Sequence, residues 1–482
     1  MTMIIKILIT LIIISFILIC AIHPFIWFVV NQQLRLVPGS KFYANWLKPS
    51  IPIRIQFYFF NLTNPKQFQH GARPILKQLG PYTYREQRFK FNVQHCPTNG
   101  GSIEYQEIKQ YYFDRDLSIG NEMDTVTNIN LGFIGIAAKL TNLPFTINWL
   151  IELFEKQHGY LLFQTKTIKQ LLWGYQDEFL TLLSDYGIQV PMKEIGLLIH
   201  RNNTPSERIL IDDGLKNAAE NFGRILKFNN QTSLNYWTTL TANMINGTDG
   251  TLYQKFLNKA HKPYVFAYDL CRSIQLNWYS TSELYNLSVY KYILSENTFK
   301  STENKGFCLN WSDCFKDGVL DMSSCQSNAP VVVSQPHFIN ADKSYQNAVE
   351  GIQPNNEEFN TTIYIEPITG LIIKAHSKFQ VNIVIRNNPK IQQLSQISNV
   401  LLPLVYFNES AQLNQTLIHQ LQMVLIQIPT IIQSILLVII VFNVLVLCSM
   451  MFKSFLQNRR DLNLQRINEE KQPLLKKESR RN

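Results

Sequence analysis

Two long apolar runs, one near each end of the 482-residue chain, constrain its fold more than any other feature. The first extends from Ile7 to Val30 and the second from Ile428 to Phe452. Each reaches the roughly 20 apolar residues that a helix needs to cross about 30 Å of hydrocarbon. A cleaved secretory signal is the alternative for the first run, but that run exceeds the usual ~7–15 apolar residues and lacks a convincing small-residue cleavage site. The sequence therefore predicts a chain that crosses one membrane twice.

The charge distribution orients the chain in that membrane. The segment after Phe452 carries nine Lys or Arg residues against four Asp or Glu residues, which is +5 of the net charge of +10. Because basic residues beside a span favour the cytosolic side, we expect residues 1–6 and 453–482 to be cytosolic and residues 31–422 to be lumenal or extracellular. Attraction of the basic tail to anionic lipid explains the high pI, and nothing indicates nucleic-acid binding.

Nine Asn-x-Ser/Thr acceptor sites agree with this topology, because they fall between the two apolar runs. The predicted glycosylation sites are Asn61, Asn202, Asn230, Asn246, Asn286, Asn310, Asn360, Asn408 and Asn414.

Four cysteines cluster in the same segment, where disulfides persist. They are Cys271, Cys308, Cys314 and Cys325. A zinc site is the alternative, but the spacings are not paired C-x2-C steps and no histidine lies among them. We therefore expect disulfides and no metal, with Cys96 left without an obvious partner.

The segment between the spans shows the pattern of a large β domain with a helical insert. Short runs rich in β-branched and aromatic residues indicate strands of an antiparallel sheet or barrel; they cover Ile51–Tyr58, Tyr82–Phe91, Ile103–Phe113, Thr361–Ile365, Gly370–His376 and Phe379–Ile385. Between about residues 125 and 183, two apolar stripes follow a helical period. The stripes are Ile147, Leu150, Ile151 and Phe154, and then Leu161, Ile168, Leu171 and Leu172.

No catalytic motif is present, since we find no G-x-S-x-G, H-E-x-x-H, phosphate-binding loop or G-x-G-x-x-G. Asp212 beside Asp213, and His95 beside Cys96, are more simply a solvated turn and a chance adjacency. We expect neither enzymatic activity nor a cofactor. A membrane-tethered hydrolase and a two-span ligand-gated channel stay open as weaker hypotheses.

Ordered motifs along the chain resemble those of the class B scavenger receptor family, which includes the lysosomal integral membrane proteins. The motifs are Leu79–Arg85, Leu171–Tyr175, Asn243–Asp249, Leu270–Ile274, Gly318–Asp321, Pro336–Phe338 and Ile365–Gly370. The resemblance implies a mixed, mainly β fold: a large irregular antiparallel β-barrel with a helical apex and an internal apolar tunnel, anchored by two terminal transmembrane helices.

The resemblance also implies disulfides between Cys271 and Cys325 and between Cys308 and Cys314. A third bridge of the family would use positions near Ala242 and Gly306, and neither is cysteine here.

In the family the apex recruits ligands, and the matching stretch here contains Lys156 and His158 as candidate contacts. A histidine at the apex could release cargo as the pH falls from about 7 to 5, since histidine ordinarily titrates near pH 6.5. The alternative is an ordinary solvated histidine.

The tail predicts intracellular sorting. Glu470, Leu474 and Leu475 have the acidic-x-x-x-Leu-Leu form that resembles the signal bound by clathrin adaptors, and a disordered tail would present it well. We expect a receptor of the lysosomal or endosomal membrane, with the plasma membrane as an alternative, that binds lipid or protein ligands and passes sterol or fatty acid through its barrel. The expected lipid ligands are sterol, fatty acid and phospholipid. An escort of a lysosomal hydrolase is the alternative within the family.

Overall fold

The structure is a computed structural model that describes residues 2–96, 101–139, 144–159, 161–190, 192–215, 221–300, 305–308 and 314–478. It divides into two compact units, one formed by residues 33–415 and the other by residues 1–32 together with 416–482. The first is called the barrel domain below and the second the terminal unit.

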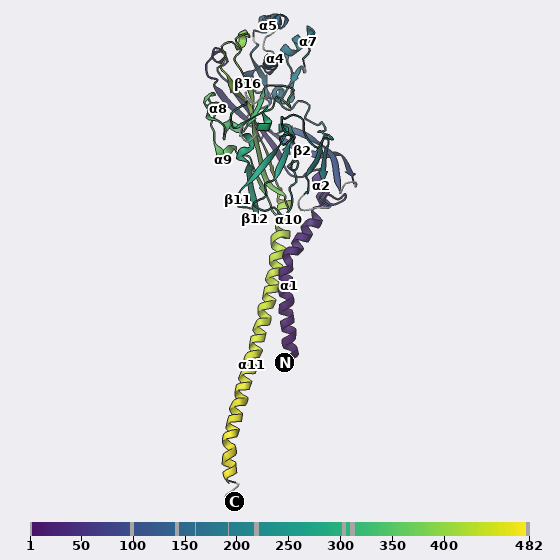
Figure 1. Ribbon diagram of the computed structural model, residues 1–482, viewed down its shortest axis with the longest axis vertical. Coiled ribbons are helices and arrows are strands. Elements are labelled where there is room, and N and C mark those ends of the chain that lie inside the picture. The colour runs from purple at the N-terminus through teal and green to yellow at the C-terminus, as the bar shows by residue number, and fades with distance from the viewer. Residues whose placement is uncertain are drawn as a thin grey trace. The chain divides into compact units, whose positions relative to one another are not determined.

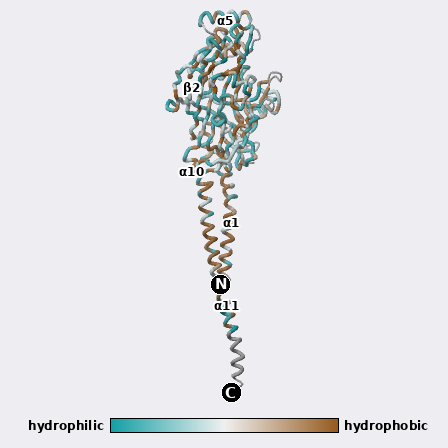
Figure 2. The backbone as a smooth tube through the Cα atoms, turned by 90° about the vertical axis from the view of Figure 1, so that its left-hand side faces the viewer, coloured by the Kyte–Doolittle hydropathy of each residue, from teal (hydrophilic) through white to brown (hydrophobic). Residues whose placement is uncertain are grey.

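The terminal unit consists of long apolar helices (Figure 2). Helix α1 covers Thr2–Gln33; α10 (Gln415–Gln422) leads through a π-helical turn at Met423–Gln427 into α11, Ile428–Glu478. Both helical stretches are long and apolar enough to cross a membrane. The amide of Asn443, buried at the level of the apolar run, donates to the Ile439 carbonyl at 2.8 Å. This bond satisfies a polar group that would otherwise be costly in hydrocarbon.

Helix α11 continues through the basic tail to Glu478. The prediction of a disordered tail is therefore wrong for the described residues. The tail is rich in Lys, Arg, Gln, Glu and Leu, which are good helix formers, and this composition accounts for the continuation.

The barrel domain is built on one 13-stranded sheet whose strand pairs are antiparallel (Figure 1). Along the sheet the order is β10-β11-β12-β15-β16-β17-β1-β2-β3-β8-β9, with β14 paired to β16 and β13 paired to β14. The strands are β1 (Ile53–Leu62), β2 (Leu76–Cys96), β3 (Ser102–Phe113), β8 (Ile209–Asp212), β9 (Ile225–Phe228), β10 (Tyr264–Ala267), β11 (Arg272–Leu284), β12 (Leu287–Leu294), β13 (Val319–Asp321), β14 (Val331–Ser334), β15 (Thr362–Ile365), β16 (Ile372–Ile385) and β17 (Val400–Gln412).

The predicted mainly β barrel is confirmed, but its strands differ from the prediction in two ways. The sequence segments predicted as strands match β1, β2, β3, β15 and β16, whereas β8 to β14 and β17 were not predicted. The two strands predicted at Gly370–His376 and Phe379–Ile385 are the single strand β16. Ser377 and Lys378, which look like a break in the sequence, pair with Glu409 and Asn408 of β17 without interruption.

A short segment around Thr248 joins the two ends of the sheet and closes the barrel. Thr248 bridges Arg224, at the start of β9, and Val265 of β10. The Ile225 amide donates to the Gly247 carbonyl at 2.8 Å on one side, and the Phe266 amide donates to the Thr248 carbonyl at 2.9 Å on the other. We call residues 247–248 the seam.

Cross-strand register identifies the side chains that face the interior of the barrel. Directly opposed residues of neighbouring strands share one face of a sheet. One such row, called the interior row, runs pair by pair from β11 to β3 through Trp278, Tyr292, Ile363, Ala375, Ala411, Ile53, Glu86 and Tyr111. Tyr292, Ile53 and Glu86 are buried, as expected for an inward face.

Helices gather at one end of the barrel domain, away from the β11–β12 hairpin (Figure 1). They are α4 (Leu131–Lys139), α5 (Phe145–His158) and α7 (Glu178–Asp185), joined by the strand pair β4 (Thr125–Ile129) and β5 (Phe163–Thr167) and by α6 (Ile168–Trp173). The remaining elements are α2 (Lys41–Leu47), α3 (Pro65–Gln69), β6 (Tyr175–Gln176), β7 (Glu194–Ile195), α8 (Lys343–Asn347) and α9 (Asn356–Phe359), together with 3-10 turns at Tyr268–Leu270, Glu296–Phe299, Lys305–Phe307, Pro336–Phe338 and Gln392–Leu394.

The first predicted helical stripe is confirmed as the buried face of α5. The second is wrong as a single helix, because β5 separates Leu161 from α6. Its apolar residues are nevertheless buried: Leu161 packs in the apical core and Ile168 in the core beneath it. Residues from a loop and from α6 are buried in the same way, so their spacing imitates the period of one helix.

Gly247→Ala should destabilise the barrel strongly. Gly247 has φ +84°, and a Cβ atom there would lie 1.9 Å from the Tyr264 carbonyl oxygen, so the seam must shift. We expect the free energy of unfolding of the detergent-solubilised full chain to fall by about 2–4 kcal/mol, measured by thermal or denaturant unfolding. Gly135→Ala in α4 is the matched control, because a Cβ there meets nothing within 4 Å. Equal stability of the two variants would contradict the role of the seam.

Candidate functional site

A cluster of charged side chains lies inside the barrel, on the wall formed by β2 and β3. Lys90 Nζ is 2.6 Å from Glu107 Oε2 and 3.3 Å from Asp249 Oδ2. Asp249, which follows the seam, also accepts hydrogen bonds from the Tyr105 hydroxyl at 2.6 Å and the Thr251 hydroxyl at 2.6 Å. A motif residue next to the seam is thus tied to two strands of the sheet.

The same wall holds a second group of charges next to the first. It is centred on Arg88 and Lys109, which oppose each other in the strand register. Arg88 forms ion pairs with Glu86 and with Glu409 of β17. Lys109 lies opposite Arg88 in the strand register and over the Tyr268 ring, 5.5 Å from its centroid. Arg88, Lys90 and Lys109 together with the four acids form what we call the interior cluster.

Burial is the largest single effect on Glu107 and opposes its ionisation, but Lys90, Arg88 and Lys109 together outweigh it and lower the Glu107 pKa to about 2. The pKa of Asp249 is also lowered, because Lys90 and the hydrogen bonds from Thr251 and Tyr105 together outweigh burial, which is the largest single effect. Both groups are therefore carboxylates at neutral and at moderately acidic pH.

The two acids beside Arg88 behave differently from each other. Burial is the largest effect on both. For Glu86 it prevails and raises the pKa, whereas for Glu409 the charges of Arg88 and Lys109, with the hydrogen bond from Arg88, together outweigh it and lower the pKa. One oxygen of Glu86, Oε2, is buried without a hydrogen-bond partner among the described residues, which also favours the neutral form. The cluster thus sets three cationic side chains, Arg88, Lys90 and Lys109, against four acidic ones.

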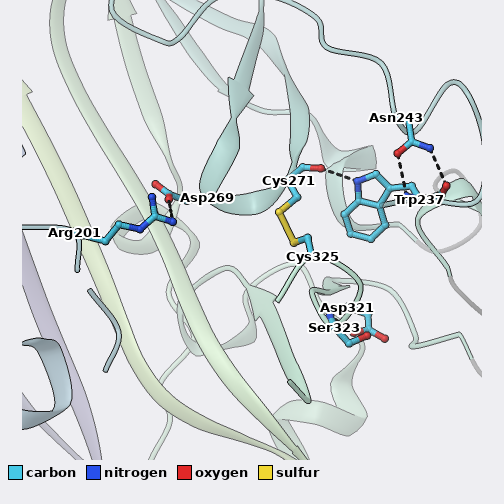
Figure 3. The surroundings of a disulfide bond; sticks show 8 residues. All are labelled: Arg201, Trp237, Asn243, Asp269, Cys271, Asp321, Ser323 and Cys325. Carbon is cyan, nitrogen blue, oxygen red and sulfur yellow. Dashed lines mark hydrogen bonds and ion pairs between the residues drawn. A yellow bond between two sulfur atoms is a disulfide. The ribbon is translucent and has the colours of Figure 1, made fainter. Parts of the chain in front are cut away.

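A disulfide fixes the opposite side of the barrel (Figure 3). Cys271 and Cys325 are bonded, and Trp237 Nε1 donates to the Cys271 carbonyl at 2.6 Å. Asn243 in turn accepts from the Trp237 amide at 2.9 Å and donates to its carbonyl at 2.8 Å. A second disulfide joins Cys308 and Cys314, so both bonds link the pairs that the family resemblance implies.

The positions that would carry the third family bridge lie against each other. A Cβ atom on Gly306 would be 2.9 Å from the Ala242 Cβ. In place of a bridge, the Gly306 carbonyl accepts bonds from the Thr238 amide at 3.0 Å and the Thr238 hydroxyl at 2.9 Å. Cys96 is a free thiol.

His337, in the Pro-His-Phe motif, is a structural residue. The Gln353 amide donates to Nδ1 at 3.0 Å, so Nε2 carries the proton and donates to Gln78 Oε1 at 2.9 Å. The ring stacks on Phe359 with centroids 4.5 Å apart. Burial lowers the His337 pKa to about 4, which keeps the ring neutral at neutral pH.

An exposed aromatic patch occupies the helical end of the barrel domain. Phe145 and Trp149 lie one turn apart on α5 and are 85% and 45% exposed, and Tyr186 after α7 is 54% exposed. Trp149 and Tyr186 meet edge to face with centroids 5.5 Å apart. We call these three residues the apical patch. A shallow open depression follows α7 and is lined by Ser184, Gly187, Ile188, Gln189 and Val190.

The two predicted apex residues lie on the same helix as the patch. Lys156 is exposed on α5. The ring of His158 stacks on Phe154, with centroids 4.4 Å apart, and its Nδ1 is 3.5 Å from Glu178 Oε2 at the start of α7. The sequence did not reveal this acidic partner. It could have revealed the patch, because Phe145 and Trp149 are large apolar residues one helical turn apart outside the core stripe.

None of the predicted glycosylation sites lies on the helices of the helical end. The chain has no acceptor site between residues 64 and 201, which include α4, α5 and α7. Asn286 lies at the turn of the β11–β12 hairpin and is exposed, whereas Asn61 is half-buried and accepts a bond from the Thr127 amide at 2.7 Å. Asn310 lies outside the described residues. Glu470, Leu474 and Leu475 belong to the backbone of α11.

Comparison with known proteins agrees with this architecture. A sequence model of the CD36 family matches residues 4–454. Lysosome membrane protein 2 of Rattus norvegicus is 36% identical over 398 residues, which is 82% of each chain. The Homo sapiens protein of the same name is 34% identical over 388 residues, which is 80% of each chain. Scavenger receptor class B member 1 of Rattus norvegicus is 29% identical over 406 residues, or 83% of this chain and 78% of that relative.

Lys90→Met should destabilise the barrel by about 3–5 kcal/mol at pH 7, because it leaves the buried Glu107 and Asp249 without their cation. The deficit should shrink as the pH falls, since the two acids can then be protonated. Unfolding of the full chain at pH 7 and pH 4.5 measures both effects. The double variant Lys90→Met with Glu107→Gln should recover part of the loss; no recovery would contradict the pairing.

His337 should make the protein less stable in acid. Its folded pKa of about 4 lies below the ordinary value of 6.5, so the unfolded chain binds more protons between these values. Stability is therefore lost as the pH falls from about 6.5 to 4, by up to about 3 kcal/mol through this group. His337→Gln should be less stable at pH 7 and flatter in this range, whereas the exposed His200→Gln should follow the parent. Identical pH profiles for all three proteins would rule out this contribution.

Proposed function

The chain belongs to the CD36 family, and from this premise we propose that it is a receptor of the endosomal or lysosomal membrane. It binds lipid or protein ligands at the helical end of the barrel domain and passes sterol or fatty acid through the barrel. No covalent step is part of this function, and no cofactor is required.

The apical patch is the observation that carries the proposal. Soluble domains rarely leave neighbouring large aromatic side chains in water unless they bind something. The patch lies on a stretch without acceptor sites for glycans, which would otherwise shield it. Exposed Lys156 on the same helix adds a positive charge for anionic lipid or protein. Aromatic rings beside a cation are suited to amphipathic ligands.

The interior of the barrel supports passage of an apolar molecule. Opposite the interior cluster, the wall formed by β11, β12 and β15 is lined by aromatic and aliphatic side chains such as Leu276, Tyr292 and Ile365. A lipid that crosses water unprotected loses about 0.8 kcal/mol of favourable burial per CH2 group, so an apolar route lowers that cost.

The relatives and the tail support the proposed location in the lysosomal or endosomal membrane. Identity is higher with the two relatives named lysosome membrane protein 2 than with scavenger receptor class B member 1. In our proposal both termini are cytosolic, and Glu470, Leu474 and Leu475 bind a clathrin adaptor. Escort of a lysosomal hydrolase by the apical patch is the second candidate, and the polar side chains at the end of α5 favour it. Lys156 and His158 are exposed there, and His158 Nδ1 lies 3.5 Å from Glu178 Oε2, so this edge of the helical end can contact a polar protein surface.

Replacing two of the three residues of the apical patch should slow the delivery of lipid. The full chain in nanodiscs is mixed with donor vesicles that carry a fluorescent sterol or a fluorescent fatty acid, and transfer is followed by dequenching. Trp149→Ser combined with Tyr186→Ser should slow transfer at least about tenfold, because the hydrophobic contact with the donor is lost. Tyr279→Ser on β11 is the control, since this tyrosine is 59% exposed but lies outside the patch.

Three results would change the assignment. Equal rates of lipid transfer by the patch variant and the parent would show that the apical patch does not take part in transfer. No transfer by the parent, with a soluble lysosomal hydrolase that binds at pH 7 and dissociates near pH 5, would establish the escort role. A ligand-evoked current in the bilayer would revive the channel hypothesis.

A further inference from the structure

Two tyrosine hydroxyls inside the barrel domain are buried without a hydrogen-bond partner among the described residues. Tyr253 is 2% exposed and Tyr292 is fully buried, and neither hydroxyl donates or accepts a bond. A buried hydroxyl left unpaired is costly, and such groups are rare in folded proteins. Two of them in one core cluster therefore require an explanation.

The register directs one of these hydroxyls toward the interior of the barrel. Tyr292 belongs to the interior row, between Trp278 of β11 and Ile363 of β15. Trp278 Nε1, next to it in the row, is a third buried donor without a partner. The donors therefore lie on the apolar wall, across from the interior cluster.

The turn of the Ile365–Gly370 motif holds Tyr253 in this group. A Cβ atom on Gly370 would lie 2.5 Å from the Tyr253 carbonyl oxygen, so the turn packs tightly against the Tyr253 backbone. Glu366 braces the turn by accepting from the Thr369 amide at 2.8 Å and the Thr369 hydroxyl at 2.5 Å. Tyr292 is among the groups that raise the Tyr253 pKa, after burial and Asp249, so the two hydroxyls are near enough to interact.

We infer that Tyr253 and Tyr292 form a hydrogen-bonding site for the uncharged polar group of a lipid that enters the barrel, the chemistry of a sterol-type alcohol, and that they select it over a carboxylate. The inference rests on the proposed passage of lipid through the barrel. The apolar cluster around the two tyrosines receives the body of the lipid, and their hydroxyls bind its oxygen. Both hydroxyls are closed off from solvent in this structure, so the surrounding side chains part as the lipid enters.

The charges near the site favour a neutral ligand. Burial raises the pKa of Tyr292 to about 12, so its hydroxyl remains a donor at neutral and acidic pH. Asp249, a carboxylate beside Lys90, acts on Tyr253 and would repel a second carboxylate there. The cations of the interior cluster are balanced by carboxylates of the chain itself, so they offer little attraction to a fatty acid.

Replacing both tyrosines with phenylalanine tests this site without loss of the fold. The substitution removes two unpaired hydroxyls, so the double variant Tyr253→Phe, Tyr292→Phe should be at least as stable as the parent. Binding of a fluorescent sterol to the full chain in detergent should weaken about tenfold, which corresponds to the loss of one or two hydrogen bonds. Binding of a fluorescent fatty acid should change less than twofold. Tyr43→Phe is the control. Tyr43 lies on the separate helix α2, and its hydroxyl is hydrogen-bonded to His95 Nε2 at 2.9 Å.

Each outcome has one meaning. Equal sterol binding by the parent and the double phenylalanine variant would overturn the inference, and a gain in stability alone would show that the hydroxyls are merely unpaired. A larger loss for the fatty acid than for the sterol would overturn the selection of a neutral ligand. If the parent binds neither lipid, the proposed passage itself fails, and this result is distinguishable from failure of the tyrosine site.

Discussion

The interior cluster is the interaction on which the rest of the barrel depends. Seven ionisable side chains enclosed by a sheet would prevent folding unless each finds a partner, because an unpaired buried charge costs several kcal/mol. The partners come from distant parts of the chain: cations from β2 and β3, Glu409 from β17, and Asp249 from the segment behind the seam. The strands and the seam must therefore assemble together. The cluster gives the closed barrel a specificity that apolar packing alone would not supply.

The arrangement of the two walls connects this stability to function. Because the charged wall is balanced internally, it does not need a ligand to be satisfied, and the apolar wall is left to contact lipid. The unpaired donors lie on the apolar wall, where they reduce stability and are available to a ligand. The helical end carries exposed aromatic residues on a stretch of sequence without Asn-x-Ser/Thr acceptor sites. In our proposals, recognition at one end and selection within the barrel are therefore assigned to different elements.

The sequence predicted a mainly β fold between two apolar terminal helices, and its strand segments match five strands of the thirteen-stranded sheet, β1, β2, β3, β15 and β16. Through the family resemblance it also predicted the residue pairs that form disulfides. It could not predict the interior cluster. Glu86, Arg88 and Lys90 alternate with Gln87 and Phe89, and a period of two with charges on one face ordinarily indicates that this face meets water. Here that face is buried, because Glu107 and Asp249 arrive from elsewhere to pair with it. The sequence could not predict the seam either. Glycine is needed at residue 247 because the Tyr264 carbonyl packs against it, and Tyr264 is distant in the sequence.

The pairing of β1 with β17 has a consequence for synthesis of the protein. β1 is translated early, and its partner on one side is β2, but the other side stays without its native neighbour until Val400–Gln412 has emerged. At about 5–20 residues per second, the intervening chain takes on the order of 20–70 s to make. During this interval a strand edge containing Phe57 and Phe59 lacks its native neighbour and is open to pairing with another chain. The order of synthesis therefore leaves one edge of the sheet exposed to aggregation until almost the whole barrel domain has been made.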